Sequence, residues 1–474
     1  MQAVVLDTAH EQTELNWWQI VKAAVAGHPA RPTEGSIPRA IMMLAIPMVL
    51  EMMMESLFAV VDIFFVSRLG ASATATVAFT ESMLALIYTV AMGLSIGVTA
   101  VVARRMGEGN REAAGQTVVQ AILLGGALAA VLGIVLGINA PHLLRLMGAD
   151  EQVIAVGSNF TRIMLGGSGV IMLLFVINAG FRGAADAAVA MRVLWIANAI
   201  NIALCPLLIY GPGPFPELGV TGSAVATTTG RGIGVLLQLA ILLRGRANLR
   251  VQLRHVRVQL DVMARLLRLS GTAMFQVFIA TASWIGLVRV LSSFGSQALA
   301  GYSISIRIVL FALLPAWGLA NAAATMVGQG LGARNPDRAE RAVWLAGRMN
   351  LAFLGTVGLI FMLGAPIIVG WFGGDVMTKA YATSSLRIIS AGFFFYAYGM
   401  VLTNAFNGAG DTWTPTFINL GCFWLLEIPL AWVLSKPLGM GPQGVFTAVL
   451  IAFSTLAVVS AVLFRQGRWK KVAV

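Results

Sequence analysis

Residues 106–114 read MGEGNREAA, and residues 331–339 read LGARNPDRA. The two stretches lie 225 positions apart and carry a glycine and an asparagine at the same places. The same displacement brings GAAD at 183–186 onto GAGD at 408–411. A displacement that stays constant across most of a chain indicates a duplicated unit.

The composition of the chain is that of a membrane protein. Of its 474 residues, 58% are hydrophobic and 11% are charged, whereas a soluble domain carries about 25% charged residues. A bilayer is crossed by roughly 20 apolar residues in a helix, and such windows recur along nearly the whole sequence. The formal charge of +12 would favour nucleic-acid binding in a soluble protein, but here membrane topology accounts for it, and we expect no nucleic-acid partner.

Twelve segments are long and apolar enough to span a bilayer, separated by polar or Gly/Pro-rich joints. The predicted spans are residues 38–66, 73–103, 114–138, 153–180, 189–210, 220–243, 264–290, 298–326, 340–364, 381–406, 414–435 and 442–464. The one longer connection, residues 244–269, is strongly basic.

The duplication and the spans together predict the fold class. Each copy holds six spans, an even number, so both copies have the same orientation in the bilayer, and Gly93 falls on Gly318. We therefore predict an all-α polytopic membrane protein with twelve transmembrane helices. They form two six-helix lobes related by a pseudo-twofold axis, with a cavity between them, as in transporters. Channels and receptors also contain repeats, but this arrangement is more typical of alternating access.

The distribution of Lys and Arg predicts the orientation. With the N-terminus in the cytoplasm, about 22 of these residues lie on the inner side and four on the outer side, a strong positive-inside bias. We expect a multi-pass protein of the plasma membrane, the inner membrane if the source is a bacterium, with both termini cytoplasmic. The predicted parts are a cytoplasmic N-terminal segment with a candidate interfacial helix (1–36), an N-lobe (37–243), a basic cytoplasmic connection (244–263), a C-lobe (264–465) and a cytoplasmic tail (466–474).

Three carboxylates share one face of the first span. On an α-helix, Glu55 lies about 40° and Asp62 about 20° from Glu51, over roughly 16 Å of rise. Charges in hydrocarbon are costly, so this face must turn toward a protein cavity. Three like charges without a cation on their own helix favour at least one bound proton. The face is therefore a candidate for ion coupling; the alternative is that the carboxylates hydrogen-bond to neighbouring helices and brace the bundle.

Other polar residues in the spans could serve either an ion site or the packing of helices. Asn198 and Asn201 could offer amide oxygens to a cation or make hydrogen bonds between helices, and Thr227 could bond to its own helix. Glu81 and Glu427 are further candidates for buried acids. We take three arginines as candidates to neutralise them: Arg231, Arg289 and Arg307.

The sequence offers little support for a metal centre or an enzyme. Its two cysteines, Cys205 and Cys422, lie in apolar segments and form no CxxC pair. The four histidines lie outside the spans. We find neither a paired-Asp metal motif nor a His/Cys nucleophile set, and we expect a protein that is not an enzyme, without a cofactor.

A set of motifs, in this order and spacing, resembles the multidrug and toxic compound extrusion (MATE) family over roughly residues 34 to 465. They are EGSIPRAIMMLAIPMVL, LFAVVDIFFVSRLG, GEGNREAA, FRGAAD, NIALCPLLIYG, GPFPELGVTGSAVAT and NGAGD. The resemblance implies two six-helix lobes forming a V, export of organic cations and drugs, and energy from inward flow of protons or sodium.

The resemblance also implies an N-lobe ion site. Asp62 resembles the first-span aspartate, Asn201 the asparagine of the fifth-span pattern Asn-Ile-x-Leu-Asp-Pro, and Thr227 the sixth-span threonine. This chain departs from the pattern at Cys205, where the family has a second aspartate. A thiol is a poor substitute for a hard oxygen ligand of sodium, so we favour protons as the coupling ion, with sodium at Asp62 and Asn201 as the alternative.

The C-lobe carboxylates that the resemblance implies for another branch of the family are missing as well. The seventh-span glutamate position is Gln276, and the tenth-span aspartate position falls near Tyr396. Glu51 is the pseudo-symmetric counterpart of Gln276, so we hypothesise that Asp62 with Glu51 or Glu55 carries the coupling, in a helix that bends near Pro47. Candidates for the substrate cavity are Glu81, Asn198, Gln276, Tyr396 and Glu427.

The predicted function is secondary active antiport. The protein would export amphipathic, often cationic, organic compounds in exchange for inward protons or sodium, acting as a monomer in the bilayer. One alternative is a lipid-linked saccharide flippase of the same superfamily, which favours a strongly basic cavity, whereas an acidic cavity suits cations. A polytopic membrane enzyme is the less favoured alternative.

Overall fold

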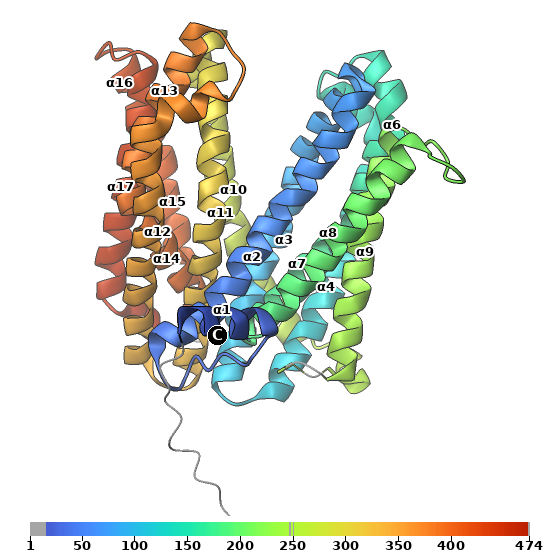
Figure 1. The fold of residues 1–474 in the computed structure, drawn as a ribbon. Coiled ribbons are helices and arrows are strands. Elements are labelled where there is room, and N and C mark those ends of the chain that lie inside the picture. Colours follow the sequence, from blue (N-terminus) through green and yellow to red (C-terminus); the bar gives the residue numbers. More distant parts are fainter. Residues whose placement is uncertain (1–15, 246–247, 250, 473–474) are drawn as a thin grey trace, which may run out of the picture.

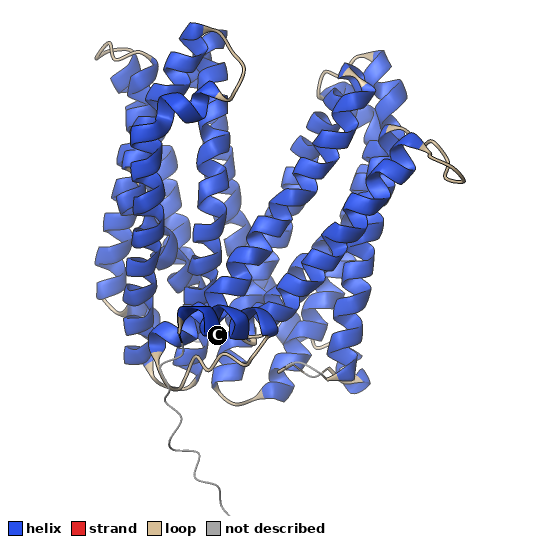
Figure 2. Cartoon of the chain, viewed as in Figure 1, coloured by secondary structure: helices blue, strands red, loops and turns tan. Residues whose placement is uncertain are grey.

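The computed structural model describes residues 16–245, 248–249 and 251–472. Part of the predicted N-terminal segment (1–15), Arg246 and Arg250 of the basic connection, and residues 473–474 of the tail lie outside the described residues. The regular secondary structure of the described part is helical throughout, with no strand (Figure 2).

Residues 37–244 form the N-terminal bundle, which is preceded by a short helix. The elements are α1 (Trp17–Ala26), α2 (Ile37–Val66), η1 (Ser67–Leu69), α3 (Ala71–Gly107), α4 (Arg111–Ile138), α5 (Ala140–Leu146), α6 (Glu151–Gly166), α7 (Ser168–Gly183), α8 (Ala187–Tyr210) and α9 (Val220–Arg244). The connection to the second bundle holds a single turn, η2 (Leu253–Val256).

The second bundle repeats this order with two irregular helices. Its elements are α10 (Leu260–Ser292), α11 (Ser296–Gly332), α12 (Pro336–Gly370), α13 (Val376–Ala391), α14 (Phe393–Ala409), α15 (Trp413–Asn419), η3 (Leu420–Glu427), α16 (Ile428–Ser435), α17 (Pro442–Arg465) and η4 (Arg468–Lys471). The pair α13–α14 is bent by 57°. The segment η3 is a π-helix between α15 and α16.

The twelve predicted spans coincide with these helices. Within the described residues, ten helices are long and apolar enough to cross a membrane, and the bent pair α13–α14 raises the number to eleven. The twelfth long helix is α2, which is 30 residues long and carries the three carboxylates.

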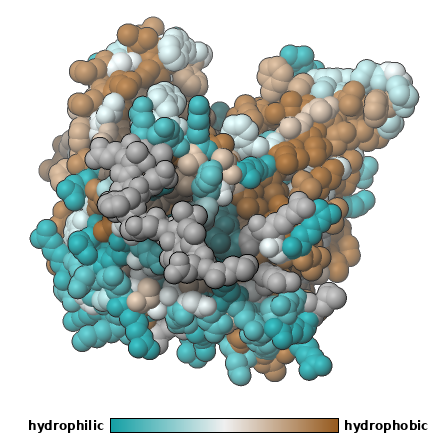
Figure 3. All heavy atoms as spheres, turned by 60° about the horizontal axis from the view of Figure 1, so that its bottom comes forward, coloured by the Kyte–Doolittle hydropathy of each residue, from teal (hydrophilic) through white to brown (hydrophobic). Residues whose placement is uncertain are grey.

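The two bundles converge at the end of the molecule where α1 lies and the C-terminus is marked, and they diverge at the other end, which gives the predicted V (Figure 1). Polar residues gather over the converging end, and apolar residues cover the flanks of the bundles (Figure 3). Leu363, Leu425 and Ile285, in helices of the C-terminal bundle, are more than 70% exposed, as expected for side chains that face lipid.

The first helix of each bundle is shared between the two hydrophobic cores. Ile41, Leu44 and Met48, in the first half of α2, pack in the core of the C-terminal bundle. Phe58 and Val61, further along the same helix, pack in the core of the N-terminal bundle. Thus α2 crosses from one lobe to the other.

Glycines allow the lobes to approach at equivalent positions. A Cβ at Gly93 of α3 would lie 2.6 Å from Met274 N of α10, and a Cβ at Gly318 of α11 would lie 2.6 Å from Val49 N of α2. Because Gly93 and Gly318 are 225 positions apart, as are Val49 and Met274, the two contacts are related by the pseudo-twofold symmetry of the repeat.

The repeated asparagines of the opening motif have the same role in both copies. Asn110 accepts a hydrogen bond from Ala113 N at 3.0 Å and caps α4, and Asn335 accepts one from Arg338 N at 3.1 Å and caps α12. An N-cap satisfies one of the unpaired N–H groups of the first turn. The motif therefore marks the start of the third span in each lobe.

Candidate functional site

Asp62 lies inside the N-terminal lobe, where α2 meets α8 and α9. Its side chain is 5% exposed. Ser223 Oγ donates to Asp62 Oδ1 at 2.9 Å, and Thr227 Oγ1 lies 2.9 Å from both carboxylate oxygens. The Cys205 thiol is the weakest donor, 3.5 Å from Oδ1. Two hydroxyls and a thiol therefore surround the carboxylate.

A second layer connects these donors. Asn201 Nδ2 donates to Thr227 Oγ1 at 2.7 Å, so that Thr227 accepts from one side and donates to Asp62 on the other. Asn201 and Cys205 are one turn apart on α8, and Ser223 and Thr227 are one turn apart on α9. This i, i+4 spacing places each pair on one helix face.

Glu55 lies about two turns before Asp62 on α2 and has a cation partner from α9. Arg231 Nη2 is 3.0 Å from Glu55 Oε1, and its Nη1 donates to Tyr88 Oη at 3.0 Å. The guanidinium also stacks over the Phe58 ring, 4.5 Å from its centroid. The sequence suggested Arg231 as a partner of Glu81 or Glu427; its ion pair is with Glu55, because the arginine lies one turn after Thr227 and faces α2, and it also interacts electrostatically with Glu81.

Glu51 lies where the two lobes converge. Its Oε1 is 2.6 Å from Arg182 Nη1 at the end of α7, and both side chains are buried. The Arg182 carbonyl accepts from Thr325 Oγ1 of α11 at 3.1 Å, and Gln329 Nε2 donates to the Gly183 carbonyl at 2.8 Å. The ion pair therefore lies beside hydrogen bonds that join the lobes.

Asp62 differs from the other two carboxylates of α2. All three lie on one helix face, but Glu51 and Glu55 are paired with arginines from α7 and α9, whereas Asp62 has no ion-pair partner in the part of the chain that the structure describes. For Glu51 and Glu55 the structure thus shows the bracing contacts that we had considered as the alternative.

The candidates for the substrate cavity are dispersed. Asn198 Nδ2 donates to the Met54 carbonyl at 2.8 Å, an inter-helix hydrogen bond. The Glu81 side chain is exposed, so its prediction as a buried acid was wrong. Gln276 is buried on α10, and its Oε1 has no hydrogen-bond partner among the described residues. The Tyr396 ring stacks on Phe453, with 4.2 Å between the ring centroids.

Glu427 is buried in the C-terminal lobe, as predicted. It is 2% exposed and ends the π-helix η3. Glu427, Gln276 and Tyr396 belong to the C-terminal lobe, whereas Glu81 and Asn198 belong to the N-terminal lobe. The structure therefore does not gather the five candidates around one cavity.

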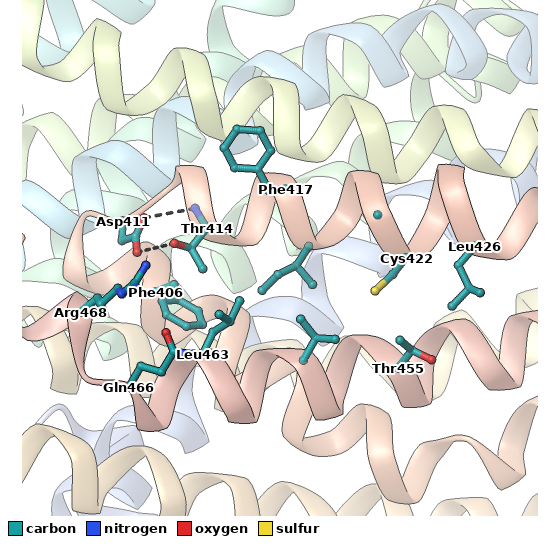
Figure 4. Close-up of a pocket in the computed structure, with 13 residues that line it drawn as sticks. Phe406, Asp411, Thr414, Phe417, Cys422, Leu426, Thr455, Leu463, Gln466 and Arg468 are labelled. Atoms are coloured by element: carbon teal, nitrogen blue, oxygen red, sulfur yellow. Dashed lines mark hydrogen bonds between the residues drawn. The ribbon is translucent and has the colours of Figure 1, made fainter.

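A cavity of about 520 Å³ lies in the C-terminal lobe between α14, α15, η3 and α17, away from Asp62. Figure 4 shows Asp411, Gln466 and Arg468 at one end of it and Cys422 and Leu426 at the other. At the first end, Asp411 lies between α14 and α15, and Gln466 and Arg468 follow α17. At the second end, Cys422 and Leu426 belong to the π-helix η3.

The family model MatE matches residues 47–207 and 272–433, one segment in each lobe. The chain belongs to the MATE family. The two matched segments correspond to the two copies of the repeat, so the MATE model confirms the duplication that the sequence displacement predicted.

Similar proteins cover nearly the whole MATE chain. "Probable multidrug resistance protein NorM" of Thermotoga maritima is 27% identical over 92% of this chain and 94% of its own length. "Probable multidrug resistance protein YoeA" of Bacillus subtilis is 27% identical over 93% and 96%. A crystal structure of MATE in complex with MaL6 superimposes with a TM-score of 0.87 at 24% identity, covering 94% of this chain and 100% of that one. That structure supports the fold.

The residues expected from the MATE resemblance come together around Asp62. Asn201 and Thr227 are in contact, and Cys205 occupies the place where the family pattern has its second aspartate. Sequence reasoning missed Ser223, Tyr88 and Arg182. Ser223 lies one turn before Thr227 on α9, and this spacing was the available signal for it.

Proposed function

We propose that this protein is a secondary active antiporter of the plasma membrane, acting as a monomer with both termini in the cytoplasm. It exports amphipathic, often cationic, organic compounds in exchange for inward protons. Membership of the MATE family and relatives named as multidrug resistance proteins support efflux of small organic compounds. In the proposed orientation, the V opens to the outside.

The unpaired Asp62 is the observation that carries this proposal. A carboxylate in the membrane interior without a cation partner is held at considerable cost, and its hydroxyl neighbours can satisfy either the charged or the neutral form, because hydroxyl groups both donate and accept. Protonation from outside would remove the charge, and release inside would restore it. Such a change of charge favours different lobe positions in the two states.

Sodium is the alternative coupling ion. Asp62, Asn201, Ser223 and Thr227 supply oxygen atoms that a hard cation could bind, but Cys205 supplies sulfur where the family pattern has a carboxylate. The donors also contact the carboxylate directly, with Thr227 Oγ1 2.9 Å from both its oxygens. These features together favour a proton.

The same charges disfavour a flippase for lipid-linked saccharides. Such a protein needs a basic cavity to bind pyrophosphate, whereas the two buried arginines of the N-terminal lobe, Arg182 and Arg231, are each neutralised by a glutamate. An unneutralised carboxylate attracts cationic substrates instead.

Transport in proteoliposomes tests the proposal. Purified protein is reconstituted, and efflux of a lipophilic cationic dye is driven by a pH gradient alone or by a sodium gradient alone. We expect dye movement with the pH gradient, and its loss in Asp62→Asn but not in the matched loop variant Asp375→Asn. Transport driven by sodium and not by protons would overturn proton coupling; transport by Asp62→Asn at the wild-type rate would remove Asp62 from the mechanism.

A further inference from the structure

Glu427 stands out among the buried carboxylates of the spans. Glu51 and Glu55 have arginine partners, and Asp62 has hydroxyl donors. Glu427 is 2% exposed, yet its side-chain carboxyl group has no hydrogen bond and no ion pair with any of the described residues. Burial of an ionised carboxylate without a donor costs several kcal/mol, so these surroundings favour the neutral form.

The segment from Asp411 to Leu434, which carries Glu427, contains one residue more than the equivalent segment of the N-terminal lobe, Asp186 to Leu208. Before this helix, the copies are 225 residues apart: Asp186 N donates to the Phe181 carbonyl at 2.8 Å, and Asp411 N donates to the Phe406 carbonyl at 3.0 Å. The residues with positive φ in these turns, Ala185 and Gly410, keep the same displacement.

At the C-terminal end of this helix, the displacement is 226. Leu218 N and Gly219 N donate to the carbonyls of Leu208 and Ile209 at the end of α8. The equivalent donors, Met440 N and Gly441 N, bind the carbonyls of Leu434 and Ser435 at the end of α16. The pairs Leu208–Leu434 and Ile209–Ser435 are 226 positions apart. One extra residue has therefore entered between Asp411 and Leu434.

The π-helix η3 accommodates that residue. A π-turn closes its hydrogen bonds one residue later than an α-turn, so an insertion can be absorbed without rotating the helix that follows. Because Glu427 is the last residue of η3, the displacement of 226 applies to it and brings it onto Asn201. The local sequences agree, since Glu427-Ile-Pro-Leu corresponds to Asn201-Ile-Ala-Leu. Glu427 thus occupies, in the C-terminal lobe, the place of an Asp62-site residue.

The surroundings of Glu427 supply groups that could respond to its charge. Tyr302 of α11, Tyr396 of α14 and Cys422 of η3 interact electrostatically with its carboxyl group. Asp261, Arg268 and Arg289 of α10 and Arg465 of α17 make no ion pair with it. Phenolic hydroxyls and a thiol are the donors that an ionised form could use after side-chain rotation.

The cavity of Figure 4 reaches the same π-helix from the end where α1 lies and the C-terminus is marked. Cys422 lines this cavity and also interacts with Glu427. Arg468, Asp411 and Gln466 at its other end are polar. Water in this cavity would come within one side chain of Glu427, on the side where the proposed antiport releases protons.

From this register and this environment, we propose that the C-terminal lobe has its own proton-exchanging site centred on Glu427, the pseudo-symmetric partner of the Asp62 site. This inference rests on the proposed proton antiport. In the exchange, the O–H bond of the neutral carboxylic acid breaks, the electron pair stays on the carboxylate and the proton passes to water; uptake is the reverse. Each lobe then holds one exchangeable proton.

Infrared spectroscopy of the purified protein tests the site directly. We expect a carbonyl band of a protonated carboxyl group that is absent in Glu427→Gln, shifted in Glu427→Asp and unchanged in the exposed-residue control Glu151→Gln. The band should lose intensity on going from acidic to alkaline buffer and on addition of a lipophilic cation. A band that is insensitive to both, or a Glu427→Gln spectrum identical to that of the wild type, would overturn the inference.

Transport stoichiometry gives a second readout. In vesicles with a pH gradient, protons moved per dye molecule should fall about two-fold in Glu427→Gln, because one of two proton-carrying groups is lost. An unchanged ratio would contradict the proposal. Failure of the antiport itself has a different signature: wild-type protein would not couple dye to protons, while the infrared bands would still report on Glu427.

Discussion

At the residue scale, the Asp62 site is defined by short donors from α9. Ser223 donates to Oδ1 at 2.9 Å and Thr227 contacts both oxygens. These hydrogen bonds stabilise the ionised form, since a bond to a charged group contributes about 1.5–3 kcal/mol. The hydroxyls therefore set the pH range over which the carboxylate can exchange its proton.

Removal of one donor should move that range. In Ser223→Ala, the neutral form of Asp62 becomes relatively more favourable, and we expect the pH midpoint of dye efflux to rise by about one unit. Efflux rates measured in vesicles over a series of external pH values give this midpoint. Ser82→Ala removes a hydroxyl that bonds to its own helix at Ala78 and should leave the midpoint in place; equal midpoints in both variants would contradict the role of Ser223.

The Glu55–Arg231 pair should be strongly coupled. Loss of one partner leaves the other buried without compensation, so Glu55→Gln and Arg231→Gln should each lower stability by about 3 kcal/mol. The double variant should be less destabilised than the sum of the two. Thermal unfolding in detergent, arranged as a double-mutant cycle, measures the coupling.

The surface pair Arg145–Glu151 provides the reference for that cycle. Its side chains are 59% and 82% exposed, and their nitrogen and oxygen atoms lie 3.3 Å apart. Exposed pairs contribute at most about 1 kcal/mol. A coupling in the buried pair no larger than in this one would mean that Glu55 and Arg231 are held by their other contacts, such as the hydrogen bond to Tyr88.

The sequence predicted residues better than it predicted partners. Helix periodicity places Glu51, Glu55 and Asp62 on one face of α2, because three residues on one helix are related by geometry alone. The arginine partners of Glu51 and Glu55 come from α7 and α9, more than 100 positions away in the sequence. Nothing in the local pattern encodes which distant side chain meets which carboxylate, so the difference between paired Glu55 and unpaired Asp62 becomes visible only in the fold.

At the element scale, the joint between α7 and α8 holds a titrating group outside the spans. Asn248, in the connection between the lobes, donates its side-chain amide to Asp186 Oδ1 at 2.8 Å. Burial raises the pKa of Asp186 from 3.8 to about 6. The folded protein therefore binds this proton more tightly than the unfolded chain does.

This difference predicts a pH dependence of stability. Because the folded pKa lies above the unfolded value, the contribution is complete below about pH 4 and is lost as the pH rises through about 6. With allowance for partial exposure, we expect a loss of about 1 to 2 kcal/mol. Asp186→Asn should flatten the change of Tm across this range.

The equivalent residue of the other lobe supplies the control. Asp411 bonds to Thr414 of its own turn, at 2.6 Å from the hydroxyl. Asp411→Asn should retain the wild-type slope of Tm against pH. If both variants flatten the slope, or neither does, the pH dependence does not come from the buried carboxyl group of Asp186.

Elements were predictable where the apolar pattern is continuous, and less so where a helix is irregular. The twelve spans followed from hydropathy, and the break between α13 and α14 lies inside one of them. The π-helix could not be predicted from the sequence. The displacement of 225 was established from motifs such as GAAD and GAGD, which precede the added residue and therefore do not reveal it. As a result, the correspondence between Glu427 and Asn201 required the hydrogen bonds at the ends of both helices.

At the scale of the whole molecule, the lobes are held together where glycine permits backbone contact. A Cβ on Gly318 would meet both N and Cα of Val49 at 2.6 Å. Backbone atoms cannot move aside as a flexible side chain can, and overpacking of this kind costs about 1–3 kcal/mol. The contact belongs to the conformation in which the converging end is closed.

Gly318→Ala should therefore weaken that conformation. We expect lower Tm, slower efflux and faster amide hydrogen exchange in α2 and α11 near the contact. Gly271→Ala is the matched control, because it lies in α10 with nothing within 4 Å of its added Cβ; it should be neutral or slightly stabilising, as alanine favours helix by up to about 1 kcal/mol. Equal effects of the two variants would show that the crossing with α2 does not restrain the lobes.

The place of this crossing along α11 has a mechanical consequence. Gly318 is 22 residues from the start of the helix at Ser296 and 14 from its end at Gly332. At 1.5 Å per residue, the two arms of such a lever are about 33 and 21 Å long. If the lobes rotate about this crossing, a given rotation moves the Ser296 end of α11 about one and a half times as far as the Gly332 end. The opening on the side of substrate uptake would then be narrower than the opening on the side of release. The uptake opening therefore sets the upper limit on substrate size.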